Sequence, residues 1–412
     1  MIRVLAAVLT VWSVSEAAEA QALNTSELEG EVIVEPEMGN QAGFDSWLAQ
    51  FATRAEAAGI PQATYGPALR GLRFDEAVIK RDRNQSEFSK TIWEYLDTAT
   101  SEERVVNGRA ALTAHAAVLA RIEAKYGVDR HVVAAIWGLE SAYGSFRGRD
   151  NTVQMLAMLA YDGRRAAFFE AQLLAALRIL ANGDVTADRM QGSWAGAMGH
   201  TQFMPTSWWD HAVDFDGDGR RDIWGDDPTD ALASAAAYLV HFGWTTGQPW
   251  GVEITLPPGF DYDQTTERVK KPVAEWAALG VKPAAGGALP EGAVASVLLP
   301  GGARGAAFLI YPNFQVIEKY NTADAYIIAV GHLADRLRGG PPVKAAWPRE
   351  LRGLSGDERR EVQTRLGAAG FDPKGVDGRI GPNTIAAVKA YQKANGLVPD
   401  GYVSVEILAR LR

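Results

Sequence analysis

The sequence contains no cysteine among its 412 residues. This absence excludes disulfide bonds, zinc sites with thiolate ligands, iron–sulfur clusters and a cysteine nucleophile. It also excludes the lipid-modified N-terminal cysteine that anchors lipoproteins. Any chemistry that the chain performs must therefore be carried by oxygen and nitrogen side chains.

Basic residues are fewer than acidic ones. The sequence has 41 Lys and Arg and 50 Asp and Glu, which gives a formal net charge of −9. Such a chain offers no basic field to a phosphate backbone or an anionic membrane surface, so we expect no nucleic-acid partner. Aromatic residues are plentiful, with 12 Trp, 12 Tyr and 14 Phe. Because flat side chains form good platforms for sugars and bases, this many Trp points to a ligand as well as to core packing.

Long hydrophobic runs are missing too, and no segment reaches the roughly 20 uninterrupted apolar residues that a membrane helix needs. A shorter apolar run, Val4 to Val14, follows Arg3 and precedes Ala18-Glu19-Ala20, which is a small-x-small cleavage site. We therefore expect a secretory signal peptide over residues 1–20 and no membrane span. The mature protein is expected in the periplasm, in a soluble form that is not a lipoprotein.

Composition divides the rest of the chain into four segments. Residues 21–42 carry five Glu and no Lys or Arg, which predicts an acidic flexible leader. Residues 43–338 form the expected main domain. Gly339-Gly340-Pro341-Pro342 opens a predicted linker over residues 339–350, and residues 351–412 form a separate small module.

The main domain has a mainly α pattern with small β insertions, that is, a mainly α (α+β) class. From residue 44 onward apolar residues recur at helical spacing. Later helices are predicted over residues 128–139, 164–180, 230–242 and 323–337. Short strands are predicted at residues 252–256 and 294–299, among Pro and Gly.

The first stretch with chemical character is Ile136-Trp137-Gly138-Leu139-Glu140-Ser141. On a helix, Glu140 follows Ile136 by four positions and Trp137 by three, so its carboxyl shares a face with large apolar groups. A surrounding of low polarity disfavours the ionised form and raises the pKa of a carboxyl, which suits a general acid near neutral pH. The alternative is that Glu140 ends the helix and points into solvent, and periodicity does not decide between the two.

The second stretch, from Gly192 to Trp208, combines small, aromatic and neutral polar residues. Small residues let the backbone approach a ligand closely, while Ser193 and Gln202 supply neutral hydrogen-bonding groups. This combination suits a carbohydrate. His200 is a tempting base, but a lone His beside a Gly is more often a polar surface residue, so we assign it no role.

Three motifs together resemble the membrane-bound lytic transglycosylase B family. They are Glu140-Ser141-x-x-Gly144, then Ala195-Gly196-Ala197-Met198-Gly199-x-x-Gln202-Phe203-Met204-Pro205, and Tyr320-Asn321 followed by Tyr326. The resemblance implies a lysozyme-like helical fold that cleaves peptidoglycan glycan strands between N-acetylmuramic acid and N-acetylglucosamine. It places Glu140 on the family's catalytic acid/base. The sugar-contacting positions of the family fall on Ser193, Gln202, Tyr238, Tyr320, Asn321 and Tyr326. One departure is Phe168, near which that family has a Tyr in its cleft.

A single carboxyl is enough for the implied reaction, whereas hydrolysis normally uses two. In a lytic transglycosylase the 6-hydroxyl of the muramic acid attacks its own anomeric carbon and forms a 1,6-anhydro ring. Glu140 would first protonate the leaving oxygen and then take the 6-hydroxyl proton. Two alternatives stay open: a muramidase that uses water, with Asp150 or Asp162 as the second carboxylate, and a non-catalytic wall-binding scaffold.

The segment Asp214-Phe215-Asp216-Gly217-Asp218-Gly219-Arg220-Arg221-Asp222 fits the first nine places of a calcium loop. Position 12 is Gly225, where Glu is expected, and the missing acid could come from Asp226 or Asp230. The resemblance favours Asp230, since related enzymes close a lengthened EF-hand-like loop with an Asp at that place. The competing interpretation is a polar turn in which Asp227 and Asp230 begin the next helix. We expect structural Ca²⁺, and no cofactor for catalysis, with the ligands Asp214, Asp216, Asp218, Asp222 and Asp230.

The terminal module has two Asp-Gly turns, at Asp377 and Asp400, between three short amphipathic helices. Alone, this pattern fits any small three-helix interaction domain. Its spacing over residues 352–412 resembles the peptidoglycan-binding type 1 module. We expect a monomer whose partner is the peptidoglycan glycan strand, with cell-wall synthesis or remodelling proteins as further candidate partners.

Overall fold

The computed structural model describes residues 39–83, 90–291 and 294–412. The predicted signal peptide, residues 1–20, and residues 21–38 of the predicted leader lie outside this part. Within the described ranges, no helix combines the length and the hydropathy that crossing a bilayer requires.

The chain divides into two compact units, and each is built from several stretches of sequence. Of the described residues, the first unit contains residues 39–83, His115–Ile122 and Ile136–Tyr238. The second contains residues 90–114, Glu123–Ala135, residues 239–291 and residues 294–412.

The first unit is helical, apart from one two-stranded pair. Its helices are α1 (Gln41–Ala57), α2 (Gln62–Leu69), α3 (Glu76–Arg83), α8 (Thr152–Asp162), α9 (Ala166–Asn182), α10 (Pro205–His211) and α11 (Thr229–His241). Two further helices, α6 (Ala116–Tyr126) and α7 (Arg130–Ser141), have ends in both units, as does α11, whose residues 239–241 belong to the second unit. Strands β1 (Asp150–Asn151) and β2 (Gln191–Gly192) pair antiparallel, with Asp150 opposite Gly192.

The start of α1 lies two residues inside the segment predicted as leader. Asn40 caps this helix, because its side chain accepts a hydrogen bond from the Gly43 N–H. The cap satisfies one of the backbone donors that a helix N-terminus leaves without a partner, and the helix therefore begins at Gln41.

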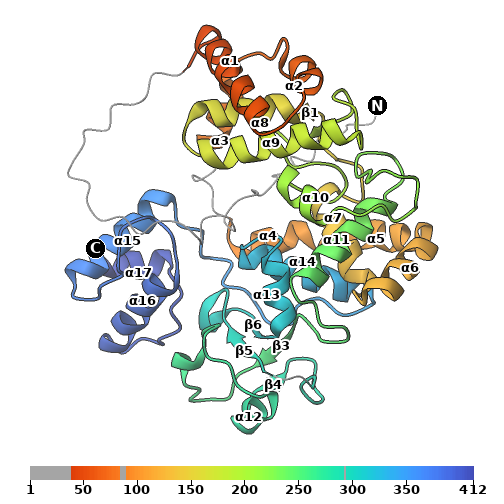
Figure 1. The fold of residues 1–412 in the computed structure, drawn as a ribbon. Helices are drawn as coiled ribbons and strands as arrows, with labels where there is room; N and C mark the ends of the chain where they lie inside the picture. The colour runs from red at the N-terminus through yellow and green to blue at the C-terminus, as the bar shows by residue number, and fades with distance from the viewer. Residues whose placement is uncertain (1–38, 84–89, 292–293) are drawn as a thin grey trace, which may run out of the picture. The chain divides into compact units, whose positions relative to one another are not determined.

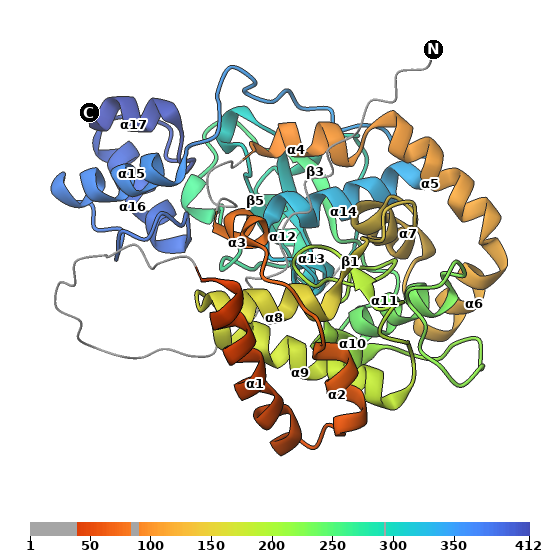
Figure 2. The ribbon, with the colours of Figure 1, turned by 90° about the horizontal axis from the view of Figure 1, so that it is seen from above.

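The α8 and α9 helices pack side by side, and α1 and α2 lie against this pair (Figures 1 and 2). Leu156 of α8 and Leu173 of α9 are fully buried in the core. Burial of one such side chain contributes about 1.5–3 kcal/mol. Arg54 of α1 also holds α9 through two hydrogen bonds to the Glu170 carboxylate, of 2.7 and 3.1 Å. This block carries β1 at one end of α8 and thus supports the loops described below.

The second unit combines helices, one sheet and the terminal module. Its helices are α4 (Ile92–Ala99), α5 (Glu102–Ala114), α12 (Val273–Ala278), α13 (Pro312–Glu318), α14 (Asp324–Leu337), α15 (Gly356–Ala368), α16 (Pro382–Ala394) and α17 (Val405–Leu411). Its strands are β3 (Gly251–Thr255), β4 (Lys282–Pro283), β5 (Ser296–Leu298) and β6 (Ala307–Ile310). All neighbouring strands are antiparallel, in the order β4-β3-β6-β5. The prediction of a mainly α fold with small β insertions is therefore confirmed.

The terminal module encloses its own apolar core, which includes Val362, Leu366 and Val388. Two buried glutamines hold its Asp-Gly turns in the same way. The Gln363 amide accepts a hydrogen bond from Gly378 N–H and donates one to the Asp377 carboxylate. A second pair of the same kind joins Gln392 to Gly401 and Asp400. The motif spacing seen in the sequence thus reflects two Asp-Gly turns, each held by the same pair of hydrogen bonds from a buried glutamine.

Candidate active site

Glu140 is the second-last residue of α7, and an unusual turn follows it. Ala142 and Tyr143 both adopt positive φ angles, of 47° and 58°, a region that non-glycine residues rarely occupy. Each such residue stores on the order of 1–3 kcal/mol of strain, which the surrounding contacts must offset. One of these contacts requires Gly138, since a Cβ atom there would lie 2.5 Å from the Tyr143 ring. The strained turn thus follows directly on the end of the helix at Ser141.

A cavity of about 650 Å³ lies at this helix end, entirely within the first unit. Glu140 lies on the wall of this cavity, near the end of the helix, and is half-buried. Ser193 and Gln202, from the second sequence motif, line the same cavity. Two stretches more than fifty residues apart in sequence are therefore brought together around one carboxyl.

Hydrogen bonds with the backbone fix both neutral polar residues. The Ser193 hydroxyl accepts a hydrogen bond from Ala197 N–H at 3.1 Å, which closes a tight turn. The Gln202 amide nitrogen donates to the carbonyls of Arg147, at 3.1 Å, and Gly199, at 2.8 Å. Both amide hydrogens are thereby used, so the group that Gln202 can offer a ligand is its carbonyl oxygen.

His200 is buried rather than exposed, which makes our interpretation of it as a surface residue wrong. Its ring nitrogens lie 3.1 Å from Trp137 Nε1 and 2.8 Å from the Gly225 carbonyl oxygen. Burial lowers the pKa of the imidazole to about 4, with a further contribution from the positive charge of Arg147. The room for the ring comes from Gly144, where a Cβ atom would lie 2.6 Å from it. The ring is therefore neutral at physiological pH.

Comparison with known protein families shows to which family the chain belongs. Residues 43–335 match the family described as transglycosylase SLT domain. The chain belongs to this transglycosylase family. Residues 355–411 match a second family, described as putative peptidoglycan binding domain.

Individual relatives agree with this family membership. The crystal structure of SltB3 from Pseudomonas aeruginosa, in complex with NAG-anhNAM-pentapeptide, is 50% identical with a TM-score of 0.87, covering 90% of this chain and 99% of that one. The Escherichia coli lytic transglycosylase Slt35 in complex with calcium is 28% identical with a TM-score of 0.61, covering 74% of this chain and 98% of that one. The membrane-bound lytic murein transglycosylase B of Escherichia coli K12 is 33% identical over 238 residues, which are 56% of this chain and 63% of the relative. The predicted resemblance and the lysozyme-like helical fold are thereby confirmed.

Four further residues of this transglycosylase-family chain are predicted sugar contacts. Tyr238, on α11 in the first unit, is buried against the Phe203 ring, at 5.6 Å between centroids, and is not among the residues lining the cavity. Tyr320, Asn321 and Tyr326 belong to the second unit, around the start of α14. The side chain of Asn321 accepts a hydrogen bond from Ala323 N–H at 3.0 Å, directly before α14 begins.

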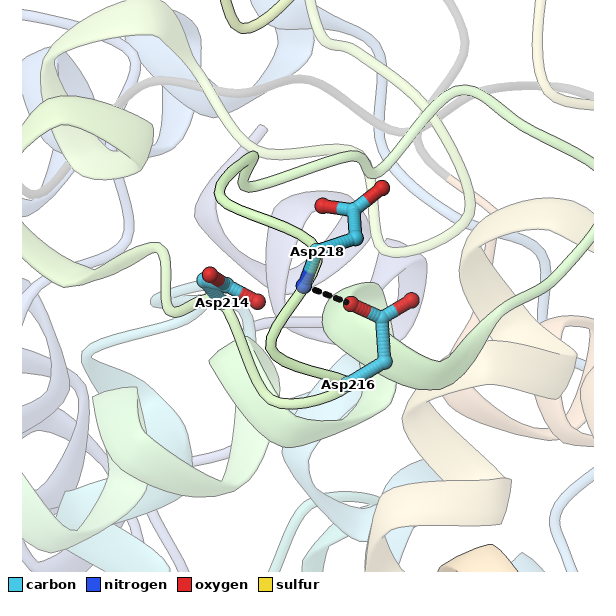
Figure 3. Close-up of side chains that lie close together, drawn as sticks. All are labelled: Asp214, Asp216 and Asp218. Atoms are coloured by element: carbon cyan, nitrogen blue, oxygen red, sulfur yellow. Dashed lines mark hydrogen bonds between the residues drawn. The ribbon is translucent and has the colours of Figure 1, made fainter.

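The predicted calcium ligands fall into two groups. Asp214, Asp216 and Asp218 are exposed, and their carboxylate oxygens lie within 4.8 Å of one another (Figure 3). The Asp222 carboxylate instead accepts hydrogen bonds from two backbone N–H groups that follow it and lies 3.5 Å from Arg189. Three converging carboxylates form a hard oxygen donor set, which fits Ca²⁺.

Asp230 lies beneath this loop and ties its two ends together. Its carboxylate accepts hydrogen bonds from the N–H groups of Phe215, Asp216 and Asp222. Burial, together with the charge of Asp216, raises the pKa of the Asp230 carboxyl to about 6 despite these hydrogen bonds. Asp227, in turn, accepts two hydrogen bonds from Thr229 at the start of α11.

The cavity wall contains further residues, of which the sequence analysis had considered Asp150 and the stretch that includes Trp194. Phe146 and Trp194 supply aromatic faces, and Phe146 is 56% exposed. Arg149 and Arg189 add positive charge, and Asp150 adds a carboxylate. Phe146 and Arg149 were missed although they closely follow the Glu140 motif, whereas Arg189 becomes part of the site only through the fold.

Proposed function

We propose that this transglycosylase-family chain is an exported lytic transglycosylase. It would cleave the β-1,4 bond between N-acetylmuramic acid and N-acetylglucosamine in peptidoglycan, with Glu140 as the sole acid/base. The observation that carries the proposal is the shared cavity of Glu140, Ser193 and Gln202. The ligand in the structure of SltB3, NAG-anhNAM-pentapeptide, contains an anhydro sugar of the kind that this reaction would form.

In the proposed reaction, the Glu140 carboxyl first donates a proton and later accepts one from the substrate. Glu140 donates its proton to the glycosidic oxygen as the bond from this oxygen to the muramic acid C1 breaks. The 6-hydroxyl oxygen then bonds to C1, and its proton goes to the Glu140 carboxylate, so no water is consumed. Phe146 and Trp194 offer faces for sugar rings, and the Gln202 carbonyl oxygen can accept a hydrogen bond from the substrate.

Product analysis tests this proposal directly. Purified protein is incubated with peptidoglycan, and the soluble products are identified by mass spectrometry. Anhydro-muramic ends support the proposal, whereas reducing ends identify a hydrolase and the absence of products identifies a scaffold.

A hydrolytic muramidase is the second candidate, because Asp150 lies on the cavity wall. The other carboxylate considered, Asp162, pairs with Arg83 at 2.7 Å and is not among the residues lining the cavity. We expect Asp150→Asn to retain turnover within a few-fold and to form the same anhydro products. A loss of 10²-fold or more, which is typical for removal of a general base, would favour the muramidase instead.

The remaining parts of the chain would bring this activity to its substrate. We infer that residues 1–20 direct export to the periplasm. The terminal module, residues 351–412, would bind peptidoglycan and raise the local concentration of glycan strands at the catalytic domain.

We also infer that the loop of Asp214, Asp216 and Asp218 binds Ca²⁺ as a structural ion. Because an ion that binds only the folded state stabilises it, Ca²⁺ at 100 times its dissociation constant should add about 2.7 kcal/mol. For a chain of this size, the melting temperature should then rise by several degrees and fall again with a chelator. Differential scanning calorimetry measures this shift.

Two variants complete the calcium experiment. Asp216→Asn should weaken or abolish the shift, whereas Asp210→Asn, which changes an exposed acid outside the loop, should leave it intact. Equal melting temperatures of the unaltered protein with Ca²⁺ and with chelator would contradict a structural ion.

A further inference from the structure

His200 joins two segments of the first unit through its side chain. Trp137, three residues before Glu140 on α7, has an indole N–H that can only donate, so Nδ1 of the imidazole must accept at 3.1 Å. The proton of the neutral ring is then on Nε2, from which it reaches the Gly225 carbonyl at 2.8 Å. Arg147 Nη1 also lies 3.3 Å from Nε2, but a guanidinium can only donate, so the Gly225 carbonyl is the acceptor for the Nε2 proton. The donor at Nδ1 and the acceptor at Nε2 together select a single tautomer.

The backbone of His200 joins the same two segments. Its N–H donates to the Ile223 carbonyl at 3.0 Å, and its own carbonyl accepts the Ser141 hydroxyl at 2.6 Å. The Ser141 oxygen also accepts a hydrogen bond from Gly144 N–H, within the strained turn after Glu140. One buried residue therefore makes two hydrogen bonds to the end of α7 and two to residues 223–225.

Arg147 strengthens this connection from the cavity side. Its guanidinium donates to the carbonyls of Trp224 and Gly225 and to the Asp226 carboxylate. Its own carbonyl accepts one of the two hydrogens of the Gln202 amide. The segment after Glu140 is thus held to the same short stretch of chain that the His200 ring contacts.

We propose that His200 is a positioning residue, which holds the end of α7, and with it the Glu140 carboxyl, against residues 223–225. It does so as a neutral hydrogen-bond bridge and takes no proton from the substrate. The low pKa of its imidazole, about 4, agrees with this role, because the ring keeps its acceptor nitrogen at neutral pH. This inference rests on the proposed role of Glu140.

The expected effect follows from how steeply catalysis depends on position. A displacement of about 1 Å in a catalytic group can reduce the rate by about 10²-fold. His200→Leu fills the space but supplies neither hydrogen bond, so kcat on soluble glycan strands should fall roughly 10- to 100-fold, with KM changed much less. His200→Gln supplies one acceptor and one donor at similar reach, and should restore at least part of the lost kcat.

A matched control is available in the second unit. His332, on α14, is also buried, and burial lowers the pKa of its imidazole to about 4 as well. His332→Leu should leave kcat unchanged, so the comparison separates loss of any buried histidine from loss of this one. The melting temperature of each variant is measured alongside, because a general loss of stability would lower the active fraction without this pattern.

The tautomer can be tested without activity, and thus even if His200→Leu does not fold. Nitrogen-15 NMR of the histidine rings, with His200 assigned by its absence in His200→Gln, should show a neutral ring with the proton on Nε2 at pH 7. A proton on Nδ1, or a charged ring, would overturn the proposal, as would a folded His200→Leu with unchanged kcat. If Glu140→Gln were also active, the proposed function itself would fail, whereas an inactive Glu140→Gln beside an active His200→Leu refutes only the positioning role.

Discussion

Glu140→Gln should remove release of anhydro-muropeptides almost completely. The amide keeps the shape of the side chain but cannot donate and recover a proton, and loss of a general acid/base reduces rates by about 10²–10⁴-fold. Because the same group acts in both steps of the proposed reaction, we expect a loss near the upper end of this range. Mass spectrometry of digested peptidoglycan, over a time course long enough to detect about 10⁻⁴ of the normal rate, measures it.

The matched control for this variant is Glu103→Gln, which changes an exposed glutamate on α5 by the same chemistry. Its turnover should equal that of the unaltered protein. Binding of glycan strands should survive in Glu140→Gln, since Ser193, Gln202 and Trp194 still line the cavity. Near-normal turnover of Glu140→Gln would exclude Glu140 as the acid/base.

The helices near the site could be predicted because their apolar residues repeat at helical spacing. Periodicity predicted helices over residues 128–139 and 230–242, and the structure has α7 over Arg130–Ser141 and α11 over Thr229–His241. The strand predicted over residues 252–256 is β3, displaced by one residue. In contrast, β6 was missed, because its four residues are all buried and show no alternation of apolar and polar side chains.

The details that shape the cavity depend on contacts between residues far apart in the sequence, and local patterns do not contain them. Positive φ angles at Ala142 and Tyr143 contradict local preference, and packing of the Tyr143 ring on Gly138 is one of the contacts that offset them. The burial of His200 likewise depends on the space that Gly144 leaves. The motifs thus indicated which residues to consider, but the fold decides what each one does.

Gly148→Ala should have the largest effect on the shape of the cavity. Gly148 lines the cavity with φ of 87°, and a Cβ atom there would lie 2.0 Å from the backbone of Gly192, next to Ser193. A left-handed conformation costs an alanine about 1–2 kcal/mol. Displacing a backbone segment adds about 1–3 kcal/mol, as overpacking does in protein cores. We expect the free energy of unfolding to fall by roughly 2–5 kcal/mol and turnover to fall at least tenfold, because the Ser193 turn must move.

Gly183→Ala separates the two causes of this effect. Gly183 ends α9 with a nearly equal φ of 86°, but nothing lies within 4 Å of the position of its missing Cβ atom. This control should therefore show the conformational cost alone, about 1–2 kcal/mol, with normal turnover. Chemical denaturation followed by circular dichroism gives the free energies, and the peptidoglycan assay gives the rates. If the two alanine variants lost equal stability and both kept full turnover, close approach of Gly148 to Gly192 would have no part in shaping the site.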